Sequence, residues 1–379
     1  MKKILSFIDW YWPGYKAGGT IRAFMNQVEY MKNDFEFFIV TRDTDYTETI
    51  PYQGIKSNQW NEISHHVSVY YVSAKNHQLA TFSRIIREFP YDVLYIHGMF
   101  SFWYSILPLF PAKFHHHRRI IVAAHGMLGS GALHVKSFKK SLFLKSLGIL
   151  QLYNGVVFHS ATEHESADIL THIGSHTSIF LARELPRKVS GQPTRQDKKA
   201  GRLTMVTVAR ISPEKNQLFA LEILSQCRNH EIQYDIIGPV YDEAYWKKCQ
   251  TLIAALPANI HVTYRGSINS EKVPAELQGY DMMLLPTTGE NFGHTILESF
   301  MAGCPVIISD RTPWRNLEES GIGRDIPLGN SDAFRKAIEQ FAGLDNEKFR
   351  EYSINAFTFA NTYIANPEML AENINLFNC

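Results

Sequence analysis

Short apolar runs of four to six residues, separated by stretches with helical spacing, most constrain the fold of this 379-residue chain. Most of these runs contain at most one polar residue, rather than polar residues at alternate positions. Such strands are typical of parallel sheets that helices cover on both faces. The predicted strands are Ile4–Ile8, Phe35–Val40, Val67–Val72, Val93–His97, Ile120–Ala124, Gly155–His159, Leu203–Val208, Tyr234–Ile237, Met282–Leu285 and Pro305–Ile308, and helical spacing is clear at Ile21–Met31 and Asn216–Cys227.

A polar segment divides this strand–helix series. Lys188–Arg202, KVSGQPTRQDKKAGR, contains Pro and Gly and has no periodicity, which predicts a linker. We therefore expect two doubly wound, Rossmann-like α/β domains, at 1–187 and 203–354, facing a cleft that binds ligand at the carboxyl ends of the strands. Glu347–Phe377 has helical spacing, and a C-terminal helix over about 355–379 can pack back onto the first domain.

The charge distribution limits the partners. With 38 Lys and Arg against 37 Asp and Glu the net charge is +1, which excludes a uniformly basic protein and disfavours nucleic acid as a partner. Residues 1–187 nevertheless carry 19 basic and 14 acidic residues, and 188–379 carry 19 and 23. Between Val93 and Thr162 there are seven Lys or Arg, seven His and no acid. This window either attracts anions or reflects chance and buried strands.

Cysteine spacing and hydropathy bear on the compartment. Cys227, Cys249, Cys304 and Cys379 form no CxxC pair and show no metal-type spacing, which favours reduced thiols in a cytosol. No apolar run reaches the roughly 20 residues of a spanning helix. We therefore expect a cytoplasmic protein that can lie at the inner face of the plasma membrane.

Two basic segments are possible places for ligand contacts. His134–Tyr153 has apolar residues on one side and Lys136, Lys139, Lys140 and Lys145 opposite. It predicts either an ordinary surface helix or a contact with anionic lipid or a lipid-diphosphate acceptor, with the aromatic run Met99–Phe114 as a further interfacial edge. His115–His117 lacks metal-ligand spacing, so we expect a charged loop there and no metal site.

The segment Met282–Asp310 is the most informative motif. It joins a buried strand to a Gly/Thr turn, a helix starting near Gly293 and a second strand. This order places Glu290 in the cleft and Glu298 two turns along the helix. Free backbone N–H groups at the helix start favour a phosphate, and they belong to His294, Thr295 and Ile296. The pattern suits a phosphate-bearing, polyhydroxylated ligand, or else an acidic cap and a solvated helix residue.

Four further places can carry ligand contacts. Arg210 and Lys215, between the strand Thr204–Ala209 and a helix start, can pair with a diphosphate or form a surface pair on a loop. Gly18 and Gly19 precede the helix Ile21–Met31 and allow close backbone approach, although a plain loop is the alternative. His125 follows a strand and stands at the cleft edge. His97 ends another strand, where it either lines the acceptor side or is a satisfied core residue.

Met282–Asp310 resembles the Glu–seven residues–Glu signature of retaining glycosyltransferases of the GT-B fold, in particular glycosyltransferase family 4, the glycosyl transferases group 1. The similarity extends to ENFG, AG-PVI and DRTPW, and Arg210–Asn216 resembles the family's R-x-x-x-x-K-N element. Tyr234–Pro239 and Tyr264–Ile268 also match family positions. Two departures are Ser299, where many members have Ala, and Pro186, which lacks the following Asn-Gly.

The resemblance implies roles for these residues. Glu290 would contact the donor sugar and Glu298 the ribose, while Arg210 and Lys215 would bind the diphosphate. The loop with Gly18 and Gly19 would face the phosphates. His125 would contact the transferred sugar, which makes it a catalytic candidate together with Glu290. Arg265, within Arg265–Ser267, would lie near the nucleotide base.

The resemblance also implies an activity. We expect metal-independent, retaining transfer of a hexosyl unit from a UDP- or GDP-linked sugar to a glycan or lipid-linked acceptor, in bacterial surface polysaccharide or glycolipid synthesis. The nucleotide sugar is then a substrate, and no separate cofactor is expected. The alternatives are a sugar-nucleotide epimerase or phosphorylase of the same fold, and a non-catalytic nucleotide-sugar-binding protein.

Overall fold

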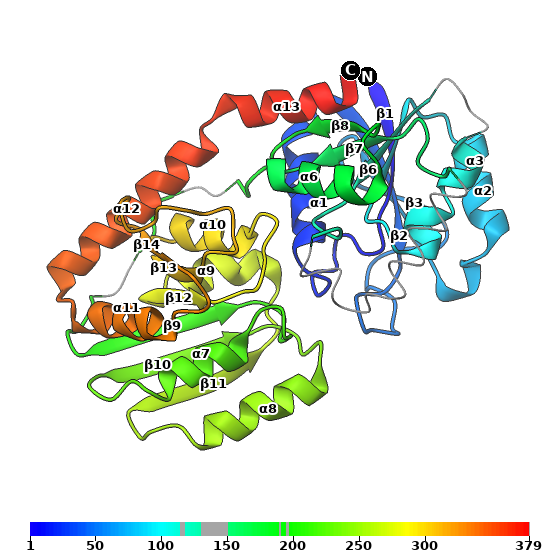
Figure 1. The fold of residues 1–379 in the computed structure, drawn as a ribbon. Coiled ribbons are helices and arrows are strands. Elements are labelled where there is room, and N and C mark those ends of the chain that lie inside the picture. The colour runs from blue at the N-terminus through cyan, green and yellow to red at the C-terminus, as the bar shows by residue number, and fades with distance from the viewer. Residues whose placement is uncertain (114–117, 130–150, 189–190, 195–196, 379) are drawn as a thin grey trace. The chain divides into compact units, whose positions relative to one another are not determined.

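The structure is a computed structural model that describes residues 1–113, 118–129, 151–188, 191–194 and 197–378 (Figure 1). The chain forms two compact units, Met1–Leu185 with Pro367–Cys379, and Pro186–Asn366. The predicted loop at His115–His117 and the basic segment Lys136–Lys145 lie outside the described residues.

The first unit is built on an eight-stranded sheet in the order β3-β4-β2-β1-β5-β6-β7-β8. Every neighbouring pair is parallel except β3 with β4. The strands are β1 (Lys2–Phe7), β2 (Phe35–Arg42), β3 (Trp60–Ser64), β4 (Val67–Val72), β5 (Val93–His97), β6 (Arg119–Ala123), β7 (Val157–Ser160) and β8 (Ser178–Leu181). The described helical segments are α1 (Gly19–Met31), η1 (Ala74–Asn76), α2 (Leu79–Glu88), η2 (Phe102–Ile106), α3 (Leu109–Ala112), α6 (Glu163–Ile173) and α13 (Pro367–Asn378).

The second unit has a six-stranded parallel sheet in the order β11-β10-β9-β12-β13-β14. In chain order within the unit this is 3-2-1-4-5-6, the doubly wound arrangement whose direction reverses between the first and fourth strands. The strands are β9 (Arg202–Val208), β10 (Glu231–Ile237), β11 (Ile260–Gly266), β12 (Met282–Leu285), β13 (Val306–Ser309) and β14 (Gly323–Ile326). The helical segments are α7 (Gln217–Leu224), α8 (Glu243–Ala254), η3 (Ser270–Lys272), α9 (Val273–Leu277), α10 (His294–Met301), α11 (Ser331–Gly343) and α12 (Asn346–Ile364).

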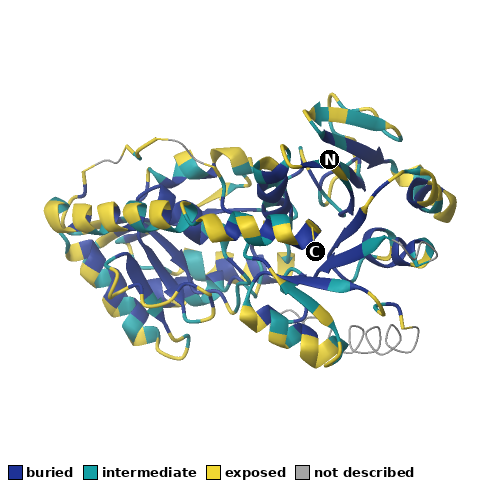
Figure 2. Cartoon of the chain, turned by 90° about the horizontal axis from the view of Figure 1, so that it is seen from above, coloured by how far each residue is buried: buried dark blue, intermediate teal, exposed yellow. Residues whose placement is uncertain are grey.

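Strand β9 shows why these sheets are covered on both faces. Its alternate residues Leu203 and Met205 enter one hydrophobic cluster, and Val206 and Val208 enter another on the opposite face. This is the two-residue period of a strand with apolar side chains in both directions. In Figure 2 the strands inside the sheets are accordingly mostly dark blue, while the helices carry yellow on their outward sides. The prediction of two Rossmann-like parallel sheets is confirmed.

The C-terminal segment is two helices rather than one. α12 ends at Ile364 in the second unit, and α13 starts at Pro367 in the first. Proline lacks a backbone N–H and disfavours helical geometry in the preceding residue, so a continuous helix ends there. α13 then buries Phe377 against the rings of Phe35, Phe37 and Tyr95.

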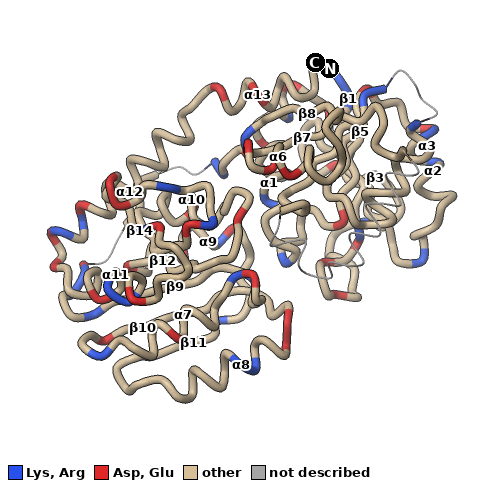
Figure 3. The backbone as a smooth tube through the Cα atoms, in the orientation of Figure 1, with Lys and Arg blue, Asp and Glu red and all other residues tan. Residues whose placement is uncertain are grey.

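Charges in the second unit are interspersed rather than gathered by sign (Figure 3). On α11, Asp332 pairs with Arg335 and with Lys336, the latter at 2.7 Å. Part of the acidic excess of residues 188–379 is therefore neutralised locally, and it forms no single acidic face on this helix.

Candidate active site

Four charged residues meet where the strand order of the second unit reverses. We call Arg210, Glu214, Lys215 and Glu290 the β9–β12 cluster. The first three follow β9 and the last follows β12, its parallel neighbour. Lys215 Nζ lies 2.6 Å from Glu290 Oε1 and 3.3 Å from Glu214 Oε1, and Arg210 lies 3.5 Å from Glu214 Oε2.

Backbone hydrogen bonds hold the two turns of this cluster together. The carbonyl of Glu214 accepts from the N–H of Thr288 at 2.8 Å and from the hydroxyl of Thr287 at 3.1 Å. The N–H of Glu290 donates to the carbonyl of Arg311 at 3.0 Å. The carboxylate and the ammonium group therefore sit on a frame that is fixed before any ligand binds.

The cluster is a charge-balanced set with restricted access to water. The Lys215 and Glu290 side chains are only 10% and 13% exposed, while Arg210 is more open and stacks on Tyr241 at 4.9 Å. A phosphate group entering here would meet two cations, and a hydroxyl group would meet a carboxylate. The sequence predicted Arg210, Lys215 and Glu290 but missed the pairing role of Glu214, for which the four-residue spacing from Arg210 was the available signal.

The start of α10 departs from one expectation. Gly293 caps the helix in the left-handed region at φ 81°, and a Cβ there would lie 2.8 Å from Ile296 Cδ1. His294 and Thr295 open the helix as expected. However, the N–H of Ile296 donates to the Gly293 carbonyl at 2.9 Å, so the prediction of three free N–H groups is wrong for Ile296. A tight first turn satisfies that donor within the chain.

The two carboxylates of the predicted Glu–seven residues–Glu motif bind different cations. Glu290 pairs with Lys215, whereas Glu298 accepts from Arg187 Nε at 2.9 Å. The Arg187 side chain is 9% exposed and also contacts Glu271. Sequence reasoning missed Arg187, although it is the residue that follows Pro186 at the point where the chain departs from the family pattern.

Arg265 lies at the end of β11, where a buried acid anchors it. Arg265 NH1 is 3.0 Å from Asp235 Oδ2, which also accepts from the hydroxyl of Tyr280 at 2.8 Å. Burial and the hydrogen bond to Asp235 raise the pKa of Tyr280, so its hydroxyl remains a donor. Arg265, the residue predicted to lie near the nucleotide base, is therefore paired with an acid of the neighbouring strand β10.

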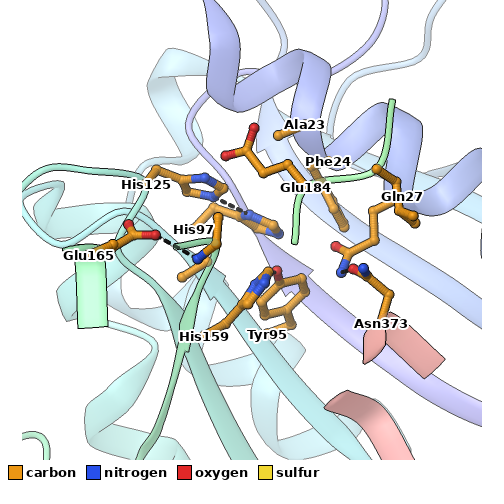
Figure 4. A pocket seen from close by; sticks show the side chains of 13 residues that line it. Ala23, Phe24, Gln27, Tyr95, His97, His125, His159, Glu165, Glu184 and Asn373 are labelled. Atoms are coloured by element: carbon orange, nitrogen blue, oxygen red, sulfur yellow. Dashed lines mark hydrogen bonds between the residues drawn. The ribbon is translucent and has the colours of Figure 1, made fainter. Parts of the chain in front are cut away.

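The first unit brings three histidines and a tyrosine around a small cavity (Figure 4). His97 ends β5 and His125 follows β6 at φ 51°, and their rings meet with Nδ1 of His97 2.9 Å from Nε2 of His125. His159 Nε2 lies 2.8 Å from the Ala182 carbonyl, which can only accept, so this nitrogen carries the proton. Nδ1 of neutral His159 then accepts from the hydroxyl of Tyr95 at 2.7 Å.

Acidic side chains from outside the acid-free window also reach this pocket. Glu165 accepts from the N–H of Gly126 at 2.6 Å and from that of Ala161 at 2.7 Å, which fixes the backbone after His125. Glu184 lines the same cavity of about 20 Å³, a volume that holds roughly one water molecule. The segment from Val93 to Thr162 contains no acidic residue, but in the folded unit two glutamates from later in the chain line the same cavity as its histidines. Tyr95 was detectable, because residues two apart on a strand share a face with His97.

Gly18 and Gly19 lie at the start of α1, which follows the carboxyl end of β1. Gly18 has φ 95°, a conformation that glycine adopts without a side-chain clash. The loop before it is held by Asp45, whose carboxylate accepts from the N–H of Tyr15 at 3.1 Å. The structure thus places this pair beside β1, in the same unit as His97 and His125.

The buried histidines predict a pH-dependent stability of the first unit. Burial holds the pKa of His97 well below its usual value and lowers that of His159. Since the unfolded chain binds protons first, near pH 6.5, the free energy of unfolding should decrease as the pH falls from 7 to 5. The slope should be up to about 1.4 kcal/mol per pH unit for each histidine. Urea denaturation at both pH values measures it.

A control separates buried from exposed histidines in this experiment. His164 on α6 is exposed, so His164→Gln should leave the slope unchanged, whereas His97→Asn should reduce it. A free energy of unfolding that does not change between pH 7 and pH 5 would contradict the neutral, buried state of these rings.

Comparison with known proteins agrees with the geometry of the second unit. Residues 192–357 match the family model described as "Glycosyl transferases group 1". The predicted resemblance is confirmed. Over 98 residues the chain is also 31% identical to the phosphatidyl-myo-inositol mannosyltransferase of Mycobacterium leprae. This match covers 25% of this chain and spans about a quarter, 26%, of the mannosyltransferase's own length.

Solved structures resemble the whole chain at low identity. Sucrose-phosphate synthase from Thermosynechococcus elongatus superimposes with a TM-score of 0.73 at 15% identity, covering 100% of this chain and 98% of the synthase. Anabaena Alr3699/HepE, solved in complex with UDP-glucose, gives a TM-score of 0.67 at 15% identity over 100% of both chains. These likenesses show the fold, which is the GT-B fold.

The described residues contain neither a candidate metal centre nor a helix that could span a membrane. No group of three or more His, Cys, Asp or Glu side chains in the described ranges could hold a metal ion. None of the helices that the structure describes is both long and apolar enough to cross a membrane.

Proposed function

We propose that this protein is a retaining, metal-independent glycosyltransferase that moves a hexosyl unit from a nucleotide-diphosphate sugar to an acceptor. The β9–β12 cluster is the observation that carries the proposal. It sets Lys215 against Glu290 at the point where the strand order reverses, with Arg210 beside them. Ligands of doubly wound sheets bind at this point.

The chemistry of glycosyl transfer fits these groups. As the bond between the anomeric carbon and the diphosphate stretches, negative charge grows on the leaving group and positive charge on the sugar ring. Arg210, Lys215 and the start of α10 stabilise the first by preorganised electrostatics. Lys215 moves its contact from Glu290 to the diphosphate, and Glu290 then accepts from donor sugar hydroxyls. Glu290 holds the sugar where the acceptor attacks, and a contact of His125 with the transferred sugar is a further part of the proposal.

The donor nucleotide is UDP or GDP in this proposal. UDP is the first probe, because the structurally similar HepE was solved with UDP-glucose. The acceptor class is a glycan or a lipid-linked glycan of a bacterial surface, and the reaction takes place in the cytoplasm at the membrane. Contact of Lys136–Lys145 with anionic lipid is part of the proposal, and sedimentation with anionic liposomes at low and high salt tests it.

A thermal-shift panel of UDP-, GDP- and ADP-sugars tests the proposed function. A nucleotide sugar at 100 times its Kd should stabilise the protein by about 2.7 kcal/mol and raise the melting temperature. Incubating the best binder with and without an acceptor extract then identifies the reaction, since an epimerase needs no acceptor. If none of the nucleotide sugars shifts the melting temperature, the proposal is wrong.

A further inference from the structure

Arg187 and Glu298 form a buried ion pair that the proposed chemistry does not yet use. Arg187 is the second residue of the second unit, and Glu298 lies on α10. Arg187 Nε is 2.9 Å from Glu298 Oε1, and the two side chains are only 9% and 7% exposed. An ion pair with so little access to water keeps its geometry, because breaking it leaves a buried charge without a partner.

All three nitrogens of the Arg187 guanidinium have an acceptor. Besides the bond to Glu298, NH1 donates to Glu271 Oε2 at 3.0 Å and NH2 to the Ser270 carbonyl at 2.7 Å. Ser270 and Glu271 belong to η3, in the connection that follows β11. Since the guanidinium is a rigid planar fork, it fixes the Glu298 carboxylate relative to this connection.

Glu298 retains acceptor capacity in this arrangement. A carboxylate offers about four lone-pair positions on two oxygens, and Arg187 uses one of them. Within the described residues Oε2 has no hydrogen-bond partner, and it is not among the fully buried atoms. The ion pair therefore leaves one oxygen for hydroxyl groups of a ligand.

We propose that Arg187 is a positioning residue that makes this site selective for ribonucleotides over deoxyribonucleotides. It holds Glu298 so that Oε2 accepts from the 2′- and 3′-hydroxyls of a ribose. The inference rests on the proposed function, because it takes the nucleotide of the donor as the ligand. A nucleotide without these hydroxyls leaves a fixed, largely buried carboxylate oxygen unsatisfied, and sites of this kind reject such analogues.

Calorimetric titration of the full chain with UDP and 2′,3′-dideoxy-UDP tests the proposal. The wild-type protein should prefer UDP by about tenfold or more. In Arg187→Gln, UDP affinity should fall about tenfold while dideoxy-UDP affinity stays nearly constant, so the preference should collapse. Arg183→Gln is the matched control, since Arg183 pairs with Glu368 and Glu372 in the first unit, and it should retain the wild-type preference.

The possible results separate this inference from the proposed function. Equal weakening of both nucleotides in Arg187→Gln indicates a merely structural role and overturns the inference alone, as does an unchanged preference. Absence of any ribose preference in a wild-type protein that binds UDP also overturns it alone. If the wild-type protein binds neither UDP nor GDP, both proposals fail.

A second variant keeps the test decisive if Arg187→Gln does not fold. Arg187→Lys retains a positive charge beside Glu298, but its ammonium cannot reach Glu298, Glu271 and the Ser270 carbonyl together in the fork geometry. We expect a ribose preference below that of the wild type. A full wild-type preference in this folded variant overturns the inference.

Discussion

Replacing Glu290 by glutamine should lower the rate of sugar transfer by about a hundredfold or more and leave nucleotide affinity nearly unchanged. Glutamine keeps the shape of the side chain but removes the negative charge that accepts from donor sugar hydroxyls, and hydrogen bonds to ionised groups are roughly twice as strong as neutral ones. In the proposed function the nucleotide contacts lie on other residues, and Lys215 keeps Glu214 as a partner at 3.3 Å.

Two measurements check the Glu290 prediction on the full chain. Nucleotide released from the best-binding sugar nucleotide, with acceptor extract present, reports transfer, and calorimetry reports nucleotide affinity. Glu318→Gln is a suitable control, because Glu318 pairs with Arg324 in the same unit but is 70% exposed, and it should transfer at the wild-type rate. Wild-type turnover in Glu290→Gln would remove Glu290 from the mechanism.

Replacing Lys215 by methionine should weaken nucleoside-diphosphate binding by about a hundredfold, because truncating one partner of a buried charge pair costs several kcal/mol in binding. The variant removes the cation from between Glu214 and Glu290 and leaves two carboxylates facing the incoming phosphates. Uridine carries no phosphate, so its weak binding should not change. The loss should shrink as salt screens the remaining charges.

A second buried lysine provides the control for Lys215. Lys198 in the same unit is also buried and donates to the carbonyl of Lys199 at 3.0 Å, and burial lowers its pKa. Lys198→Met should change the melting temperature but not the affinity for UDP. If Lys215→Met binds UDP as tightly as the wild-type protein does, the diphosphate does not bind at the β9–β12 cluster.

The sequence predicted the covered strands of both sheets and missed the strands at their edges. The ten apolar runs all became strands, with shifts of at most three residues at their ends. The rule of continuous apolar runs did not detect β3, β8, β11 and β14, which are the edge strands of the two sheets. β3 and β8 are largely exposed or half-buried, and β14 is four residues long. A strand with one neighbour needs less apolar sequence, so its pattern is weak.

The sequence predicted those site residues whose positions follow from the order of strand, turn and helix along the chain. It did not predict the ion pairs between residues that are far apart in the sequence. A strand, a turn and a helix start place Glu290, Arg210 and Lys215 at one edge of a sheet without further information. The pairing of Lys215 with Glu290 spans 75 positions, and that of Arg187 with Glu298 spans 111. Such contacts follow from the assembled topology, which neither composition nor spacing contains.

The order in which the chain leaves the ribosome has a consequence for the first unit. The second unit is one continuous stretch, residues 186–366, whereas the first unit also needs α13. Phe377 on α13 packs against Phe35 and Tyr95, and the Phe377 backbone carbonyl accepts a hydrogen bond from Lys2 Nζ. During synthesis the second unit therefore has all its residues first, although it comes later in the chain. Until α13 emerges, the aromatic side chains that Phe377 covers in the folded unit stay uncovered, and transiently exposed apolar surface of this kind favours aggregation of a nascent chain.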